Sequence, residues 1–356
     1  MKYMLFTLLP FILLSCSSPT TPAVNAVSTN VESQAPAEQA VQPKAEAGKL
    51  IASVTVKNFP TESYALYLPT GYKDTLQYAL MVFFDPHGDG NVPLEKYKVL
   101  ADKYGFILAG SNSSKNGMDI PTVNGIASHL LADLQGTYKI KKGHICFAGF
   151  SGGAIAAIKA AISSADVTHV IYCGQSANLE GLKHPLTFLG FAGTRDMNYS
   201  NVLQLHQLLE GSPYKHYLIE WNGKHEWPDA SVFANAFQEF DKIPAVKLKH
   251  ISAAEITALK SEDEEKNNLV NALGSQSPEW WSQKIAALKA SAKSNAKADR
   301  LLGYVSLACY SISKNLLAQN RLDDAEKILA IYAIADPGNK DCEEFTRQLQ
   351  QKKQGH

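Results

Sequence analysis

The sequence has no excess of charge of either sign, no paired-cysteine motif and no apolar run of membrane-spanning length. Its 34 Lys and Arg residues balance 34 Asp and Glu residues, so no net field would draw the chain onto nucleic acid. The five cysteines include no CxxC pair and do not cluster with histidine, which argues against a zinc site or a redox dithiol. We therefore expect no metal and no nucleic-acid partner, and we expect four of the cysteines to be small buried apolar residues.

The fifth cysteine, Cys16, closes an apolar segment at the N-terminus. In MKYMLFTLLPFILLSC one lysine precedes an apolar run that ends in LLSC, an arrangement that resembles a bacterial lipobox. The run is too short for a membrane span, which takes about 20 apolar residues. Residues 1–16 are thus expected to be a lipoprotein signal peptide. Cys16 would carry the lipid and anchor the exported chain in the bacterial cell envelope, with the outer membrane as the expected site. An ordinary secretory signal is the alternative.

The segment that follows has the composition of a tether. Residues 17–49 are mostly Ser, Thr, Pro, Ala, Gln and Glu with few large apolar residues, and such a segment cannot offset the entropy of ordering itself. We expect a flexible linker that lets the folded part stand away from the lipid surface.

Short apolar segments alternate with amphipathic ones between residues 50 and 245. QYALMVFF (77–84) is continuously apolar, as expected of a strand covered on both faces of a parallel sheet. Strands are expected at 52–59, 62–69, 77–84, 106–110, 144–150, 168–173, 185–191 and 215–221, and helices at 93–105, 122–138, 152–164, 201–210 and 230–240. Strands separated by helices pair in parallel with helices on both faces. We predict a doubly wound, mostly parallel α/β sheet whose ligands bind outside the carboxyl ends of the strands.

The strand pattern disappears after Pro244. Helices are expected near 252–273, 278–293, 298–319, 322–335 and 339–351, which predicts a smaller all-helical domain over 246–356. LLAQNRLDDAEKILAIYAIADPGN within it resembles a tetratricopeptide repeat, with matching positions at Ala325, Leu329, Tyr332 and Pro337. The helices either bind a protein partner or pack against the preceding domain.

The segment GFSGG (149–153) fits the pattern G-x-S-x-G. An apolar strand leads into it and a helix rich in alanine leaves it, as a nucleophile elbow requires. Ser151 would sit at a strained corner that needs small neighbours, and the Gly152 N–H is the expected first oxyanion donor. A serine that only caps the helix is the alternative.

A nucleophilic serine needs a base beside it and a carboxylate that orients the base. In sheets that carry such an elbow, the chain order is serine, acid, histidine. His225 lies in WNGKHEWP directly after the last expected strand, and Asp196 follows the preceding strand in FLGFAGTRD. We predict that these two residues complete the triad, with Glu180 as the alternative acid.

The turn FDPHGDG (84–90) follows a buried strand and is the expected source of a second oxyanion donor. The Asp89 amide is the first candidate, although its carboxylate would repel an oxyanion unless it is turned away. Gly88 or His87 could donate instead, and a purely structural turn is a further alternative.

Aromatic residues flank the predicted acid and base. Tyr199 and Trp227 are expected to bind substrate, because aromatic faces there could hold a sugar or an aromatic acyl group. The alternative is that both residues belong to the core.

The motifs GFSGG, GTRD and GKHEWP, with FDPHGDG upstream, resemble the branch of the α/β-hydrolases that holds esterases, polyhydroxybutyrate depolymerases and feruloyl esterases. The resemblance covers about residues 50 to 243 and does not reach the helices. It implies a Ser-Asp-His triad, no cofactor, and carboxylic esters, small or polymeric, as substrates. A serine peptidase or thioesterase with the same triad is one alternative. The other is an inert envelope scaffold that binds a partner through its helices.

Overall fold

The structure is a computed structural model, and it describes residues 45–238 and 250–354. The described residues belong to one compact unit. The predicted signal peptide, Cys16, most of the predicted linker 17–49 and the predicted boundary at 245/246 lie outside the described residues. None of the helices in the described part combines the length and apolar character of a membrane span.

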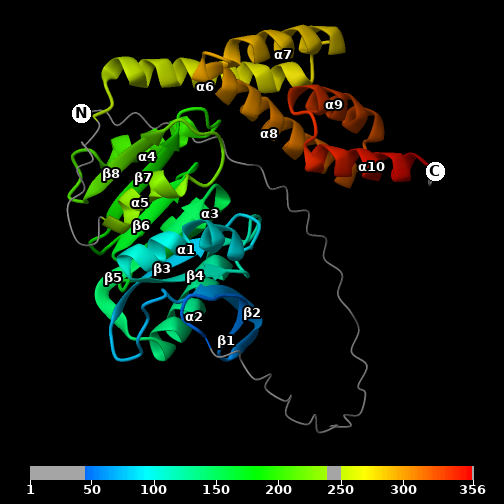
Figure 1. Cartoon of the computed structure of the whole chain (residues 1–356). Helices are drawn as coiled ribbons and strands as arrows, with labels where there is room; N and C mark the ends of the chain where they lie inside the picture. The colour runs from blue at the N-terminus through cyan, green and yellow to red at the C-terminus, as the bar shows by residue number, and fades with distance from the viewer. Residues whose placement is uncertain (1–44, 239–249, 355–356) are drawn as a thin grey trace, which may run out of the picture. The chain divides into compact units, whose positions relative to one another are not determined.

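Eight strands form one sheet in the order β1-β2-β4-β3-β5-β6-β7-β8 (Figure 1). Only β2 runs antiparallel to both of its neighbours, and the pairs from β4 to β8 are all parallel. The predicted α/β fold with a mostly parallel sheet is therefore confirmed, and the sheet has the topology of an α/β-hydrolase. The strands are β1 Leu50–Val56, β2 Phe59–Tyr67, β3 Tyr78–Phe84, β4 Phe106–Ser111, β5 Ile140–Phe150, β6 His169–Cys173, β7 Thr187–Gly193 and β8 His216–Trp221.

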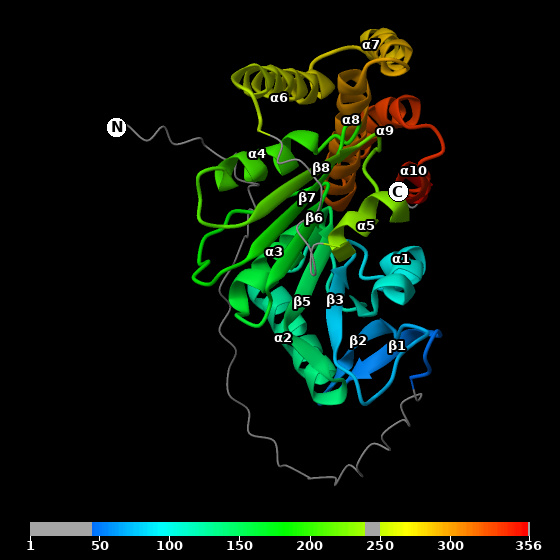
Figure 2. The same cartoon turned by 60° about the vertical axis from the view of Figure 1, so that its left-hand side comes forward.

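Helices cover both faces of the sheet, as Figure 2 shows. Helices α2, α3 and α4 pack with one hydrophobic cluster, and α1 and α5 pack with another on the opposite face. Strand β3 divides its side chains between the two clusters, with Val82 on one face and Phe83 on the other, because successive side chains of a strand alternate. These helices are α1 Asn91–Tyr104, α2 Ile120–Thr137, α3 Gly152–Ser163, α4 Tyr199–Leu209 and α5 Ala230–Gln238.

The C-terminal helices have a hydrophobic cluster of their own around the buried Trp281. Ser252 and Ser277 cap the first two of them by accepting backbone N–H bonds, which satisfies donors that a helix leaves unpaired. The five helices expected from sequence are confirmed, and whether they include a tetratricopeptide repeat stays a prediction. They are α6 Ala253–Leu273, α7 Pro278–Ala292, α8 Ala296–Ala318, α9 Leu322–Ala335 and α10 Lys340–Gln354.

The C-terminal helices are joined to the core of the sheet through the start of α6. Ile251 belongs to the cluster that α2, α3 and α4 form, and Ile256 and Leu259 pack against that cluster. The helices therefore share apolar contacts with the domain before them.

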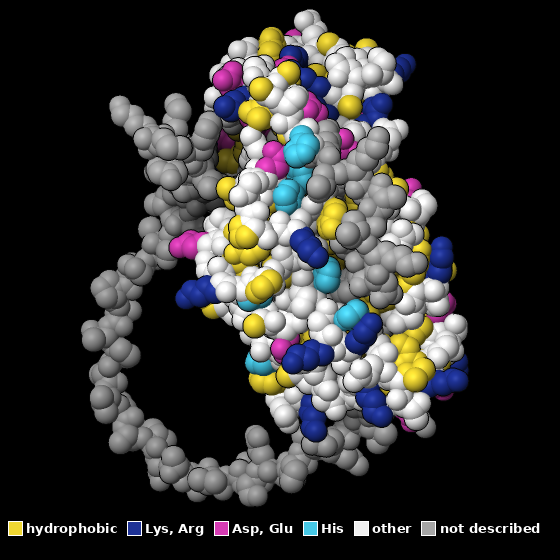
Figure 3. All heavy atoms as spheres, turned by 90° about the vertical axis from the view of Figure 1, so that its left-hand side faces the viewer, with side chains coloured by type: hydrophobic (Ala, Val, Ile, Leu, Met, Phe, Trp, Pro, Cys, Tyr) yellow, Lys and Arg dark blue, Asp and Glu magenta, His cyan; other side chains and the backbone are white. Residues whose placement is uncertain are grey.

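Charged side chains of both signs are scattered over the described part of the face drawn in Figure 3, between small apolar patches. This distribution agrees with the equal numbers of basic and acidic residues in the sequence.

Candidate active site

Ser151 lies at the corner between β5 and α3 with φ 54° and ψ −125°, a left-handed conformation that costs a non-glycine residue about 1–3 kcal/mol. The glycines on either side make the corner possible. A Cβ on Gly149 would lie 1.9 Å from the Gly153 carbonyl oxygen, and one on Gly153 would lie 1.9 Å from the Phe84 carbonyl oxygen. Ser151 makes no side-chain capping bond to α3, so helix capping does not account for it.

The structure brings the three predicted residues together. Oγ of Ser151 lies 2.9 Å from Nε2 of His225, and Nδ1 of His225 lies 2.9 Å from Oδ1 of Asp196. The side chain of Asp196 is 2% exposed and that of His225 is 20% exposed. These distances suit a serine hydroxyl that donates to an imidazole whose other nitrogen donates to a carboxylate. Glu180, the alternative acid, is exposed, so the carboxylate at His225 comes from Asp196.

Residues 194–198, which we call the acid turn, hold the Asp196 carboxylate in place. The Asn198 N–H donates to Oδ1 of Asp196 at 2.8 Å, and the Asn198 side chain donates to the Gly174 carbonyl at 2.9 Å. Gly174 has φ +62°, and a Cβ there would lie 2.7 Å from Oδ2 of Asp196. The carboxylate therefore packs directly on backbone that only glycine can provide. The sequence analysis identified neither Asn198 nor Gly174. Gly174 directly follows β6, and Asn198 lies shortly after the end of β7.

The acid turn is also bonded to residues 221–225, which we call the base loop. The Thr194 N–H donates to the Trp221 carbonyl at 2.8 Å, and the Arg195 N–H donates to the Gly223 carbonyl at 2.9 Å. These two bonds continue the pairing of β7 with β8 beyond the strands. They set the acid and the base at neighbouring positions on one edge of the sheet.

Gly152, the expected first oxyanion donor, lies in the first turn of α3, where the backbone N–H groups have no partners inside the helix. The side chain of Asn116 lies over Gly152, because a Cβ on that glycine would be 1.7 Å from Oδ1 of Asn116. Any side chain at position 152 would displace Asn116. The sequence held no local signal for Asn116, which lies on the loop after β4.

Asp85 organises the turn that was expected to give a second oxyanion donor. Its carboxylate is buried and accepts the His87 N–H at 2.9 Å and the indole N–H of Trp227 at 3.0 Å. The Gly88 N–H donates to the Asp85 carbonyl at 3.1 Å. The amides of His87 and Gly88 are thus both engaged within the turn, and Gly88 as an oxyanion donor stays a prediction.

Asp89 turns its carboxylate toward the start of α1. Its Oδ1 accepts the Asn91 N–H at 3.0 Å and the Asn91 side-chain amide at 3.1 Å. These bonds hold the carboxylate against Asn91. The Asp89 amide as second donor stays a prediction.

The two aromatic residues expected to bind substrate serve other contacts. Trp227 is 5% exposed and packs on Phe150 with ring centroids 5.6 Å apart. Tyr199 bonds Glu220 through its hydroxyl, and the guanidinium of Arg300 lies 4.8 Å from the centre of its ring. Burial, followed by the bond to Glu220, raises the pKa of Tyr199. Trp227 is thus buried in the core, and Tyr199 as a substrate-binding residue stays a prediction.

A small cavity of about 120 Å³ lies beside Gly152. Its apolar wall includes Met118, Ile120, Val123 and Ile155, and Asp85 and Asn116 also line it. Its place next to the serine corner makes it a recess where a bound group could lie close to Gly152.

The cysteines Cys146, Cys173, Cys309 and Cys342 are all buried, as expected from the sequence, and burial raises the pKa of each thiol. Within residues 45–238 and 250–354, no group of three or more His, Cys, Asp and Glu residues is placed to hold a metal ion.

The sequence matches no protein-family model, and no curated protein matches it significantly. Similar solved structures include an esterase from Pyrobaculum calidifontis, with 12% identity and a TM-score of 0.42 over 55% of this chain and 83% of that one. S-formylglutathione hydrolase from Staphylococcus aureus has 12% identity and a TM-score of 0.43 over 50% and 92%. A feruloyl esterase module from Clostridium thermocellum, complexed with sinapinate, has 14% identity and a TM-score of 0.44 over 57% and 90%. Likenesses at such low identity carry no argument about activity, so a function for this chain has to be argued from its own residues.

Proposed function

We propose that the chain is a serine hydrolase that acts on carboxylic esters, with Ser151, His225 and Asp196 as its catalytic triad. One observation carries the proposal: two contacts of 2.9 Å link the hydroxyl, the imidazole and the carboxylate in that order. The strained backbone of Ser151 supports it, because strain of this kind gathers at functional sites.

In the first half of the reaction, Oγ of Ser151 attacks the acyl carbon while Nε2 of His225 takes the hydroxyl proton. Asp196 holds the imidazole in the tautomer that accepts this proton and stabilises the imidazolium that forms. The Gly152 N–H binds the developing oxyanion. His225 then gives its proton to the leaving alcohol, and an acyl-serine results.

In the second half, His225 takes a proton from water as the water attacks the acyl-serine. The tetrahedral intermediate collapses, the carboxylic acid leaves, and the proton returns from His225 to Oγ of Ser151. The same three groups and the same N–H serve both halves.

The surroundings of the triad support an accessible site with a small apolar recess. The segment 174–186 between β6 and β7, all of it described, contains no helix, so no helical lid is inserted there. The cavity beside Gly152 has an apolar wall, which suits a short acyl group, and polar side chains that include Lys115 and Asn116 also line it. An open site accommodates a bulky alcohol, as in an esterified polysaccharide.

We also propose that Cys16 carries a lipid that anchors the chain in the bacterial cell envelope. The N-terminal segment and the tether-like composition of residues 17–49 support this proposal. Growth with an alkyne-tagged fatty acid should label the wild-type chain and leave a Cys16→Ser variant unlabelled. Equal labelling of both would contradict the anchor.

The activity is tested with a panel of nitrophenyl esters, a thioester and a peptide substrate. Ser151→Ala should lower kcat for the best ester by roughly four to six orders of magnitude, because the nucleophile is lost, and its Tm should stay close to that of the wild type. The control is Ser275→Ala, which changes an exposed serine after α6 and should keep full activity. Hydrolysis retained by Ser151→Ala would defeat the proposal. Turnover restricted to the thioester or the peptide would support one of the other reaction classes.

A further inference from the structure

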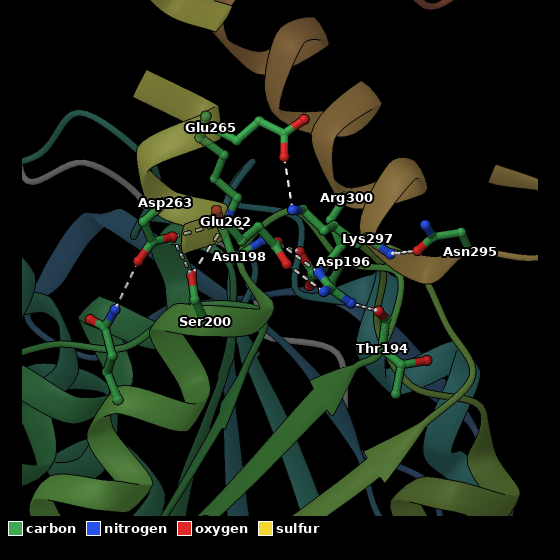
Figure 4. A network of polar contacts seen from close by, with 12 residues as sticks. Thr194, Asp196, Asn198, Ser200, Glu262, Asp263, Glu265, Asn295, Lys297 and Arg300 are labelled. Carbon is green, nitrogen blue, oxygen red and sulfur yellow. Dashed lines mark hydrogen bonds and ion pairs between the residues drawn. The ribbon is translucent and has the colours of Figure 1, made fainter. Parts of the chain in front are cut away.

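The acid turn contacts the C-terminal helices at the point where it carries Asp196. Arg300 on α8 donates from Nη1 to the Thr194 carbonyl at 2.5 Å, two residues before the predicted catalytic acid. The same guanidinium donates from Nε to Glu262 of α6 at 2.8 Å, and Nη2 donates to the second oxygen of that carboxylate. Figure 4 shows this guanidinium between the acid turn and α6.

Asp299, the residue before Arg300, bridges the acid turn and the base loop. Its Oδ2 accepts from Nη1 of Arg195 at 2.9 Å, and its Oδ1 lies 3.3 Å from Nζ of Lys224. Arg195 and Lys224 immediately precede Asp196 and His225 in the sequence. One carboxylate of α8 therefore joins the neighbours of both predicted catalytic residues.

A third contact follows the acid turn into α4. Ser200 accepts from Nζ of Lys266 at 3.3 Å and donates to Asp263 at 3.2 Å, and both partners belong to α6. Lys266 is 4% exposed. The residues before and after Asp196 are thus both held by side chains of the C-terminal helices.

These contacts are better suited to holding the acid turn in position than to stabilising the fold as a whole. Glu262 and Arg300 have side chains that are 3% and 11% exposed, and a buried ion pair recovers little more than its cost of desolvation. A planar guanidinium, however, fixes the angle between its partners, because its donors point in set directions. Arg300 uses that property to join α6, α8 and the acid turn.

We infer that α6 and α8 act as a clamp on the acid turn and base loop, in which Arg300 and Asp299 are positioning residues that keep Asp196 aligned with His225. The inference rests on the proposed function for its effect on turnover, and on the contacts of Arg300 and Asp299 alone for its effect on His225. It gives the C-terminal helices a part in the reaction without contact with the substrate.

The test uses the full chain and two pairs of matched variants. Arg300→Gln removes the guanidinium, and Asp299→Asn removes the charge that joins Arg195 to Lys224 while keeping the size of the side chain. The controls, Arg321→Gln and Asp324→Asn, disrupt an exposed pair of the same kind at the start of α9, whose atoms lie 2.7 Å apart. If Arg300→Gln does not fold, Asp299→Asn decides the test by the same measurements.

Two measurements are made on each variant. The first is kcat and KM for the best ester, for which we expect kcat to fall roughly 10- to 100-fold, because small misplacements of reacting groups have effects of this size. KM should change less than about threefold, since the clamp does not touch substrate. The second is the NMR signal of the proton on Nδ1 of His225, recorded with labelled histidine and assigned with a His225→Ala spectrum. The chemical shift of this proton should move upfield as its hydrogen bond to the Asp196 carboxylate loses its alignment.

The controls should match the wild type in both measurements. A folded Arg300→Gln variant with unchanged kcat and an unchanged His225 Nδ1–H signal would overturn the clamp. If Ser151→Ala is inactive while Arg300→Gln is fully active and its His225 Nδ1–H signal is unchanged, the clamp fails and the proposed function holds. If no ester is turned over but Arg300→Gln moves the His225 Nδ1–H signal, the proposed function fails and the clamp holds.

Discussion

The acid–base half of the site and its proposed oxyanion half are held in place by contacts of different kinds. The acid turn is bonded to the base loop through its backbone and to α8 through Arg300 and Asp299. In the turn after β3 the buried Asp85 carboxylate accepts from the turn and from Trp227, and the remaining bonds join the turn to the loop after β4. The difference teaches that the loss of Asp85 should disturb the oxyanion half more than the loss of Arg300 or Asp299 alone disturbs the acid–base half.

The largest effect in this comparison is expected at Asp85. Asp85→Ala leaves the buried indole N–H of Trp227 without its acceptor, which costs about 1–3 kcal/mol. It also frees the turn that carries the predicted second oxyanion donor, so kcat should fall by roughly 100-fold. Urea unfolding and kcat for an ester measure both effects. Asp74→Ala, an exposed control on the loop before β3, should change neither, and an Asp85→Ala variant that behaves like this control would break the comparison.

A smaller effect is expected when acid weakens the contacts of Glu262. Burial raises the pKa of Glu262, but the hydrogen bonds and charge of Arg300, aided by Lys266, outweigh burial and bring the pKa below its usual value of 4.5. A carboxyl with a lowered pKa in the folded state stabilises the fold above its unfolded pKa. It loses that contribution as the pH falls through the lower folded value. The free energy of unfolding should therefore fall below about pH 4.5 partly because of Glu262.

Urea unfolding at a series of pH values measures this effect. Glu262→Gln should show a shallower loss of stability in that acidic window than the wild type. Glu343→Gln, which changes an exposed residue of α10, should follow the wild-type curve. If Glu262→Gln loses stability at low pH as steeply as the wild type, the Glu262 carboxyl contributes nothing to the pH dependence of the free energy of unfolding.

The smallest effect is expected at Gly303 of α8, which packs on the acid turn. A Cβ there would lie 3.2 Å from Sδ of Met197, a flexible side chain that can give way. Gly303→Ala gains about 0.5–1 kcal/mol of helix propensity, so the close contact should leave the net change in stability within about 1 kcal/mol and kcat within about threefold.

The matched control is Gly125→Ala in the interior of α2, where the nearest atom to an added Cβ is 4.0 Å away, on His129. It should gain the helix propensity without a close contact and leave kcat unchanged. If Gly303→Ala lowers kcat as much as Asp85→Ala does, the acid–base half tolerates substitution no better than the oxyanion half.

The sequence located Ser151, Asp196 and His225 because each follows a buried strand whose place is set by local apolar pattern. Parallel strands deliver the residues after them to one edge of the sheet. Ends of elements were less well predicted: β5 begins at Ile140 rather than 144, because Ile140 pairs with Tyr78 of β3 ahead of an irregularity in the register.

The supporting contacts could not be read from the sequence, because they join distant residues. Trp227 was expected to face substrate, yet its indole is buried against Asp85, 142 positions away. Arg300 lies 106 positions from Thr194, and no local periodicity relates the two. The helices were predicted correctly, but their hold on the acid turn depends on tertiary packing alone.

The central claim, that Ser151 is a nucleophile activated by His225, is tested most directly by reaction with a fluorophosphonate and mass spectrometry of the labelled peptides. The wild-type chain should carry the adduct on Ser151, since the activated hydroxyl attacks phosphorus as it would an acyl carbon. A His225→Ala variant should carry little or none. An unlabelled wild type, an adduct on another residue, or equal labelling of the two chains would contradict the claim.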